Sequence, residues 1–355
     1  MRCWKTARKV SKTKTSLALL EDEELTDYSA ALYLRGLKII KDLEKEAVIS
    51  FPDPALDMAV RIAVNKTCGN LKYKDVKDLK VLNAPRRKIS NLSGIEQLTS
   101  LRELYLMGNE ISSLEPLNQL DGLYSLNLSH NRISEINSLA KMNKLTRLYL
   151  GRNQINNIRV LSGLVSLKEL ILSYNEIEDV RSLTGLTRLE ELHLTGNNIH
   201  EIKGFERLKK LRTLSLSGNR IAQIDNLTNL KGMEKLWLSH NSISNLNGIK
   251  GMKKLHLLYL GSNQIREIDA LAPLKDLKDL DLSDNLIQNI RSLVSNNSLS
   301  ELRLSKNQVR NINVLLSLKK LGIVELDHNP IHPNENAACR HVLVQLAKRG
   351  CLIKF

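Results

Sequence analysis

LRELYLMGNEISSLEPLNQLDG, residues 101–122, and LTRLYLGRNQINNIRVLSGLVS, residues 145–166, are two copies of one 22-residue pattern. The pattern is L-x-x-L-x-L-x-x-N-x-I-x-x-I-x-x-L-x-x-L-x-x, and ten units repeat it over residues 101–320 without an insertion or deletion. Its L-x-L core has a period of two, which places both leucines on one side of a short strand. A single unit cannot bury these leucines, so the fixed period predicts a solenoid of stacked units. The ten units begin at Leu101, Leu123, Leu145, Leu167, Leu189, Leu211, Met233, Leu255, Leu277 and Leu299.

The stacking of the units predicts one parallel sheet, with neighbouring strands about 4.8 Å apart. A degenerate unit begins at Leu79 and a truncated one at Leu321, so we expect roughly twelve strands. The later I-x-x-I-x-x-L-x-x-L run of each unit has a period of three, which is typical of 3₁₀ or extended turns. The predicted fold class is therefore α/β, a right-handed solenoid with a concave parallel sheet and a 3₁₀ or extended convex side.

The 22-residue pattern resembles the leucine-rich repeat, in which each unit supplies one strand to a horseshoe. This spacing is shared by internalins and by the protein-phosphatase-1 regulator class. The segments FPDPALDMAVRIAV (51–64) and LKYKDVKDLKVLNA (71–84) are similar to the N-terminal helical cap of internalin-type bacterial repeat proteins. The end of the chain resembles the C-terminal cap of bacterial leucine-rich repeats. The resemblance implies helical caps at both ends of the solenoid.

An asparagine occupies position nine of every full unit, and Arg87 takes this place in the degenerate first unit. The amide of asparagine both donates to and accepts from main-chain groups, which a tight corner after each strand requires. We therefore predict a structural role for this series and not a catalytic one. Its members are Asn109, Asn131, Asn153, Asn175, Asn197, Asn219, Asn241, Asn263, Asn285, Asn307 and Asn329.

The ends of the chain differ from the repeats. Residues 1–20 form a basic arm, and a helix is expected from Thr26 to about Val48, either packed on the end of the solenoid or used to dock a partner. Asp53 is expected to cap a helix that begins at Pro54. The predicted division is 1–50 for the arm and its helix, 51–78 for the N-terminal cap, 79–334 for the repeats, and 335–355 for a cap helix with a short final strand.

Positions three, five, seven and eight of each unit are expected to face out of the concave sheet. The position-five series contains Trp237 and Tyr259 in adjacent units, and such rings are frequent energetic anchors of interfaces. We therefore predict a partner-binding surface here, although the rings could instead only stack on one another. The candidate residues are Tyr105, Tyr149, Ile171, Tyr174, His193, Lys235, Trp237, His240, Leu257, Tyr259, Asp281 and Arg303.

The formal net charge is +15, which permits nucleic-acid binding. At the four outward positions, however, acidic side chains outnumber basic ones, so the excess Lys and Arg is expected on the arm, the caps and the convex side. This distribution disfavours nucleic acid on the concave face. A basic arm could contact an acidic partner or RNA. Acidic residues at 279, 281, 284 and 301 favour a protein partner with a basic patch.

Catalytic and targeting motifs are missing from the sequence. It has no P-loop, no G-x-G-x-x-G, no H-E-x-x-H and no G-x-S-x-G, so we predict a protein that is not an enzyme and has no cofactor or metal. No apolar run reaches the length of a membrane span, and the four cysteines are scattered, which favours a cytoplasmic monomer with reduced thiols. The leading hypothesis is a protein-interaction scaffold. The alternatives are a phosphatase-regulator-like subunit and a secreted or surface internalin-like effector, although no secretion signal or wall anchor is evident.

Overall fold

The computed structural model describes residues 27–334 and 336–355. The basic arm predicted at residues 1–20 and the expected start at Thr26 therefore lie outside the described residues. The chain divides into two compact units. The smaller contains helix α2 (Asp27–Glu46) and residues Asn70–Asp75, and the larger contains Ser50–Gly69 and Val76–Phe355. None of the described helices combines the length and apolar character needed to span a bilayer.

The smaller unit is held together by contacts between the end of α2 and the segment around Lys72. The Glu46 carboxylate accepts hydrogen bonds from the amines of Lys72 and Lys74. These bonds lower the pKa of Glu46 to about 2. Val48 forms an antiparallel bridge with Lys72, just before the short helix α4 (Tyr73–Val76) begins. The helix predicted to end near Val48 is confirmed, although it ends at Glu46.

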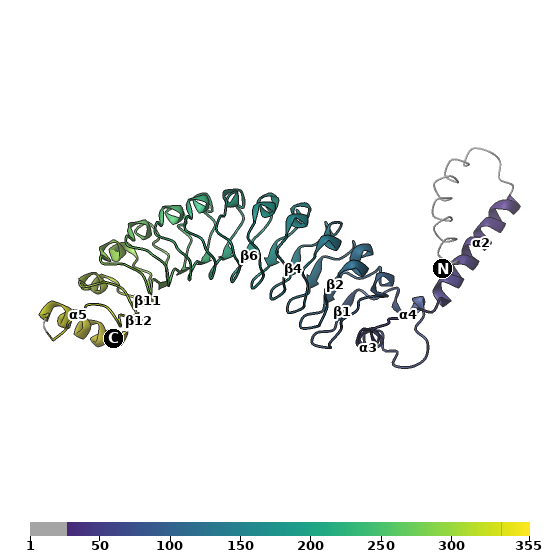
Figure 1. Cartoon of the computed structure of the whole chain (residues 1–355), viewed down its shortest axis with the longest axis horizontal. Helices are drawn as coiled ribbons and strands as arrows, with labels where there is room; N and C mark the ends of the chain where they lie inside the picture. Colours follow the sequence, from purple (N-terminus) through teal and green to yellow (C-terminus); the bar gives the residue numbers. More distant parts are fainter. Residues whose placement is uncertain (1–26, 335) are drawn as a thin grey trace. The chain divides into compact units, whose positions relative to one another are not determined.

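The larger unit is built on one 13-stranded parallel sheet, with its strands in sequence order. In neighbouring repeat strands, each residue pairs with the residue 22 positions later in the chain, as Leu236 does with Leu258. This register confirms the predicted fold class, and the strands line the inner side of the arc in Figure 1. The strands are β1 (Val81–Asn83), β2 (Glu103–Tyr105), β3 (Ser125–Asn127), β4 (Arg147–Tyr149), β5 (Glu169–Ile171), β6 (Glu191–His193), β7 (Thr213–Ser215), β8 (Lys235–Trp237), β9 (Leu257–Tyr259), β10 (Asp279–Asp281), β11 (Glu301–Arg303), β12 (Ile323–Glu325) and β13 (Leu352–Lys354).

Short 3₁₀ helices occupy the outer side of the arc, one for each repeat (Figure 1). These turns explain the period of three in the second half of each unit, because a 3₁₀ helix has three residues per turn. The turns are η1 (Ile95–Gln97), η2 (Glu115–Gln119), η3 (Asn137–Leu139), η4 (Arg159–Gly163), η5 (Arg181–Gly185), η6 (Phe205–Arg207), η7 (Asp225–Leu227), η8 (Asn247–Ile249), η9 (Asp269–Leu271), η10 (Arg291–Ser295) and η11 (Asn313–Ser317).

The core between sheet and turns consists of the repeated leucines and isoleucines, nearly all of them inaccessible to solvent. Phe205 replaces the usual leucine in one turn and is fully buried. One departure from the apolar pattern is Asn296, which is fully buried at a position where neighbouring units have Leu274 and Leu318. Because apolar burial stabilises in proportion to area, the stacked core is the main stabilising element of the solenoid.

The asparagine series fixes the corner after each strand, as the sequence predicts. Asn197 is representative: its Oδ1 accepts from the Ile177 amide at 3.0 Å, and its Nδ2 donates to the carbonyls of Leu172 and Leu194 at 3.1 and 3.0 Å. The residue before each asparagine, from His130 to His328, has a left-handed backbone or is a glycine. This corner ends every strand after three residues and directs the chain towards the 3₁₀ turn.

Both ends of the solenoid are covered by helices. Asp53 caps α3 (Pro54–Ala63) by accepting from the amides of Ala55 and Leu56, which confirms the predicted cap. Its second oxygen accepts from the amides of Ser90 and Asn91 in the first repeat unit, at 2.8 and 3.0 Å. At the other end, α5 (Ala337–Lys348) precedes β13, which pairs with β12 and satisfies the last repeat strand.

Candidate functional site: the outward face of the sheet

The outward face of the sheet carries two parallel rows of side chains, from the first and third residues of each strand. The strand register places the third residues side by side, so that Trp237 pairs with Tyr259, and Ile171 lies between Tyr149 and His193. The central residue of each strand from β1 to β12 points into the core and is buried. Residues 22 positions apart are thus spatial neighbours, and the row can present a continuous surface.

The best-defined cluster in the row joins three predicted residues. The rings of Trp237 and Tyr259 meet edge to face, with centroids 6.4 Å apart and planes at 80°. The guanidinium of Arg303 lies over the Tyr259 ring, 5.6 Å from its centroid. Edge-to-face and cation–π contacts of this kind each contribute about 0.5–1.5 kcal/mol. The two predicted rings are therefore in contact with each other, and both remain partly exposed to solvent.

Carboxylates hold this cluster in place. Arg303 donates to Asp279 and to Glu301, both at 2.7 Å, and the Tyr259 hydroxyl donates to Asp279 at 2.7 Å. Burial and the Asp279 carboxylate raise the pKa of Tyr259, so the phenol stays neutral and acts as a donor. Burial disfavours the charge on Arg303, but Asp279 outweighs it and the pKa of Arg303 is raised. The side chains are fixed without any bound partner.

A second group of predicted residues lies on β4, β5 and β6, in the same row of third residues. The Tyr149 hydroxyl donates to Glu169 at 2.5 Å, and burial together with this carboxylate raises the pKa of Tyr149. Burial lowers the pKa of His193, although Glu191 at 3.9 Å opposes the shift. His193 is therefore neutral near pH 7 and presents a flat ring beside Ile171. Further along, the Tyr105 hydroxyl bonds to Glu103.

Tyr174 lies at the corner after β5, with a left-handed φ of 59°. The guanidinium of Arg152 lies 4.3 Å from its ring centroid. On the other side the ring contacts the backbone of Gly196, where an added Cβ would come within 2.7 Å of it. Glycine at this position lets the tyrosine ring lie against the next unit. Half of the Tyr174 side chain remains exposed.

The remaining predicted residues are not drawn into these clusters. Lys235 and His240 are exposed, and within residues 27–334 and 336–355 their side chains have no hydrogen bond, ion pair or ring contact. Leu257 is partly exposed at the start of β9. Asp281 accepts from the Ser283 amide at 2.9 Å, so its carboxylate serves the local turn. In the described part of the chain, no three His, Cys, Asp or Glu side chains are grouped so that they could hold a metal ion.

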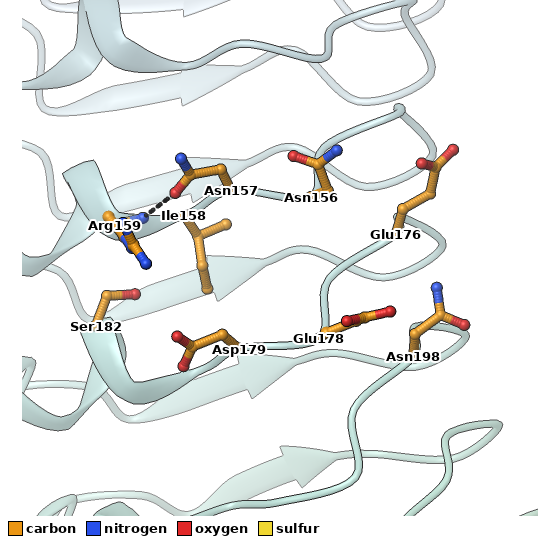
Figure 2. Close-up of a pocket in the computed structure, with 9 residues that line it drawn as sticks. All are labelled: Asn156, Asn157, Ile158, Arg159, Glu176, Glu178, Asp179, Ser182 and Asn198. Carbon is orange, nitrogen blue, oxygen red and sulfur yellow. Dashed lines mark hydrogen bonds between the residues drawn. The ribbon is translucent and has the colours of Figure 1, made fainter.

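The sequence did not predict a groove that runs beyond the asparagine series on one flank of the solenoid. It has a volume of about 560 Å³ and crosses three successive units, from Asn156 to Asn198. Figure 2 shows Asn156 and Asn157 on one unit, Asp179 and Glu178 on the next unit below them, and Asn198 beside Glu178. Arg181 bonds Asp179 and lowers its pKa to about 2, so the carboxylate is ionised at neutral pH. The only sequence signal for it is a run of polar residues at matching positions of neighbouring units.

Comparisons with known proteins agree with this geometry. A family model described as "Leucine rich repeat" matches residues 99–155, 121–177, 156–199, 166–221 and 231–287, and one described as "Leucine Rich repeats (2 copies)" matches residues 209–251. No curated protein matches the sequence.

Several solved structures are similar to the chain. An internalin, InlF, from Listeria monocytogenes has a TM-score of 0.75 at 26% identity, over 86% of this chain and 96% of that one. The functional domain of InlJ from the same organism has a TM-score of 0.74 at 25% identity, over 81% of this chain and 63% of that one. A leucine-rich repeat protein of Leptospira interrogans has a TM-score of 0.65 at 26% identity, over 80% of this chain and 85% of that one.

Proposed function

Because this chain belongs to the leucine-rich repeat family, we propose that it is a non-enzymatic interaction scaffold that binds a protein partner on the outward face of its sheet. The observation that carries the proposal is the cluster of Trp237, Tyr259 and Arg303, whose side chains are held in place yet partly exposed. Trp, Tyr and Arg are the residue types in which interface energy concentrates. Side chains that are already ordered also lose little entropy on binding.

The charges around the cluster indicate the chemistry of the partner. Asp279, Glu301 and Glu325 surround Arg303, and Lys354 pairs with Glu325 at 2.6 Å, so three acids face two cations and this end of the face is acidic overall. A partner with a basic patch beside an apolar surface would complement it, because complementary charges fix orientation and speed association. The second group, Tyr149 and Ile171 with neutral His193, would extend the contact along the row.

The proposal is tested by affinity capture from a nuclease-treated lysate with the intact chain. Three baits are compared: wild type, Trp237→Ala/Tyr259→Ala, and the control Val165→Ala/Val294→Ala. The control removes side chains that are 52% and 54% exposed away from the row. A partner retained by wild type and control, and bound by the ring variant with at least a tenfold higher Kd, supports the site. Equal retention by all three folded baits refutes it.

A second function, that of a secreted or surface effector, is favoured by the likeness to internalins over most of the chain. We propose a cytoplasmic location as the leading alternative to the effector, since the scattered cysteines are typical of a protein with reduced thiols. Fractionation of the source cells with protease treatment of intact cells separates the two: digestion of the protein on intact cells supports the effector. A phosphatase among the captured proteins would support a regulatory subunit.

A further inference from the structure

The turns that precede the strands carry a concentration of cations in the C-terminal half of the repeats. Within residues 206–278, ten lysines and arginines lie at the last five positions of a unit or at position two of the next. Only three acids, Glu206, Glu234 and Asp276, share these positions, and all ten cations are exposed. We call this surface the basic flank. Its members are Arg207, Lys209, Lys210, Arg212, Lys231, Lys250, Lys253, Lys254, Lys275 and Lys278.

The sheet brings these residues to one edge. All strands are parallel and in register, so the amino ends of β7 to β10 lie on the same side. The turns are also bonded to each other: the Glu234 amide donates to the Arg212 carbonyl at 2.8 Å, and the Lys278 amide donates to the His256 carbonyl at 2.9 Å. With strands about 4.8 Å apart, the four turns extend about 15 Å along the edge.

Most of this charge is not neutralised within the protein. Arg212 pairs with Glu234 at 3.0 Å. The other nine cations have no ion pair with any residue that the structure describes. Nearby like charges destabilise a folded protein through mutual repulsion. A surface that keeps such charges together without acidic neighbours is suited to a polyanion.

The opposite flank of the same four units has no such excess. There Lys203, Arg220 and Arg266 are interspersed with the acids Glu201, Asp225, Glu267 and Asp269. Lys203 pairs with Glu201 at 2.9 Å. The outward face is acidic near Arg303, as described above. The cations are therefore segregated to one edge, and the net charge of +15 does not by itself explain this arrangement.

The surroundings of the basic flank discriminate between kinds of polyanion. The turn positions that form the basic flank in residues 206–278, all of which the structure describes, expose no large apolar side chain and no Phe, Tyr or Trp ring; the partly exposed Trp237 and Tyr259 belong to the outward face of the sheet. Membrane-surface binding usually adds buried apolar area, and single-strand binding uses aromatic rings on which bases stack. Neither feature is present. Lysines dominate, and lysine binds phosphate as a point charge without reading bases.

We propose that the basic flank binds the phosphate backbone of a nucleic-acid duplex without sequence preference. This binding would use a different surface from the proposed protein site, so both partners can be held at once. It agrees with the expectation that nucleic acid is disfavoured on the outward face, because the two surfaces carry opposite charge. Duplex DNA and duplex RNA present the same backbone chemistry, and the experiment separates them.

The test measures the salt dependence of binding with the full chain, using fluorescence anisotropy of a labelled 20-base-pair duplex between about 50 and 200 mM KCl. The flank variant is Lys210→Gln/Lys231→Gln/Lys253→Gln/Lys254→Gln. The matched control, Lys203→Gln/Arg220→Gln/Arg266→Gln/Arg291→Gln, removes the same charge from the opposite flank. Residues 1–20 are present in every protein, so their contribution is common to all. Circular dichroism and urea unfolding check that each variant is folded.

We expect the flank variant to bind at least about tenfold more weakly at the lowest salt, and its slope of log K against log [salt] to fall by about 3 to 4. The control should keep a slope close to that of wild type. If the quadruple variant does not fold, Lys253→Gln and Lys254→Gln are measured singly, each lowering the slope by about 1.

Further probes are duplex RNA, single-stranded DNA of equal length, and phosphatidylcholine vesicles containing phosphatidylserine. Tighter binding of one duplex shows whether DNA or RNA is the preferred ligand. Equal binding of both supports recognition of the phosphate backbone that they share. The proposal is overturned if wild type binds no duplex at 50 mM salt, or if the flank variant and the control behave alike. It is also overturned if single strands or vesicles bind more tightly than duplexes.

Discussion

Trp237 on β8 and Tyr259 on β9 meet edge to face, 6.4 Å apart between centroids, on a surface that is open to solvent. In this contact the edge of one ring meets the face of the other, and both residues stay partly accessible to solvent. The Tyr259 hydroxyl is fixed by Asp279, so the tyrosine can hold the indole in one orientation. The pair is therefore ordered before any partner binds.

This arrangement predicts a spectroscopic response that needs no partner. In a Trp4→Phe background, which leaves Trp237 as the single tryptophan, Tyr259→Ala should shift the emission to longer wavelength and increase quenching by acrylamide. The indole would lose its neighbouring ring and contact more water. Tyr259→Phe keeps the ring and should change both signals much less. Equal quenching in the two variants would show that the tyrosine ring does not shield Trp237.

The fold can be predicted from the sequence because every repeat needs the same residue types at the same positions of its backbone. Leu236 and Leu258 must face the core for the units to stack, and Asn197 must bond the corner, so both were visible as periodicity. The same period of 22 places Trp237 beside Tyr259. It does not reveal that Arg303 reaches Asp279 on the neighbouring strand and the Tyr259 ring two strands away, because these contacts depend on side-chain length and rotamer.

Other features of the site carry no periodic signal. The fit of Tyr174 against Gly196 requires a left-handed backbone at one unit and a missing side chain at the next. The groove in Figure 2 arises from the depth of the turns between units, which composition alone does not give. The basic flank likewise has no periodic signal, since its members lie at several positions of the repeat and meet only when the units stack.

The asparagine series predicts a large loss of stability from one substitution. Asn197→Ala leaves the Ile177 amide without its acceptor in a buried corner, whereas the carbonyls of Leu172 and Leu194 lose one donor each but still accept from Asn175 and Asn219. An unpaired buried donor costs about 1–3 kcal/mol and each lost bond to a carbonyl about 0.5–1.5 kcal/mol, so the free energy of unfolding should fall by about 3 kcal/mol. Urea unfolding followed by circular dichroism measures it.

The adjacent Asn198 provides the control for this prediction. It is partly exposed and its side chain lines the groove, so Asn198→Ala should change the free energy of unfolding by less than about 0.5 kcal/mol. A comparable loss in both variants would mean that the corner tolerates the missing bonds, and that the series has a role other than structure.

The Asp53 cap predicts a pH-dependent contribution to stability. Burial disfavours its charge, but backbone donors from Ser90, Asn91, Leu56 and Ala55 outweigh it and lower the pKa of Asp53 below 3.8. A carboxyl with a depressed folded-state pKa stabilises the protein above its unfolded-state pKa, and this contribution is lost as the pH falls through the folded-state pKa. The stabilisation is therefore complete near pH 7 and declines below about pH 4.

Replacing the Asp53 carboxylate tests the direction of this pH dependence of stability. Asp53→Asn turns one acceptor oxygen into a donor facing other donors, and should destabilise the protein by about 2 kcal/mol near pH 7. The difference from wild type should shrink as the pH is lowered below 3.8, as measured by urea midpoints across the range. Asp57→Asn removes only a pair with Arg61 in the same helix and should cost about 0.5 kcal/mol. A constant difference at every pH would contradict the assignment.

Asn296 predicts a gain of stability, which is the opposite outcome for a buried asparagine. Its Oδ1 has no hydrogen-bond partner among the described residues, whereas its Nδ2 donates to the carbonyls of Leu271 and Leu274 at 3.0 and 2.8 Å. Those carbonyls already accept from the amides of Leu274 and Leu277, so removing the side-chain amide leaves neither of them unpaired. Leucine has the same branched arrangement of side-chain heavy atoms, with larger methyl ends, and it fills this position in the neighbouring units.

Asn296→Leu should therefore raise the free energy of unfolding by about 1–2 kcal/mol, because it removes an unpaired buried oxygen and buries apolar surface instead. The urea midpoint measures the gain. Asn297→Leu, at the exposed neighbouring position, should give no increase, since its side chain is already solvated. A lower midpoint for Asn296→Leu would show that the two amide bonds stabilise the turn by more than the orphaned oxygen costs, and that this unit differs from its neighbours for a structural reason.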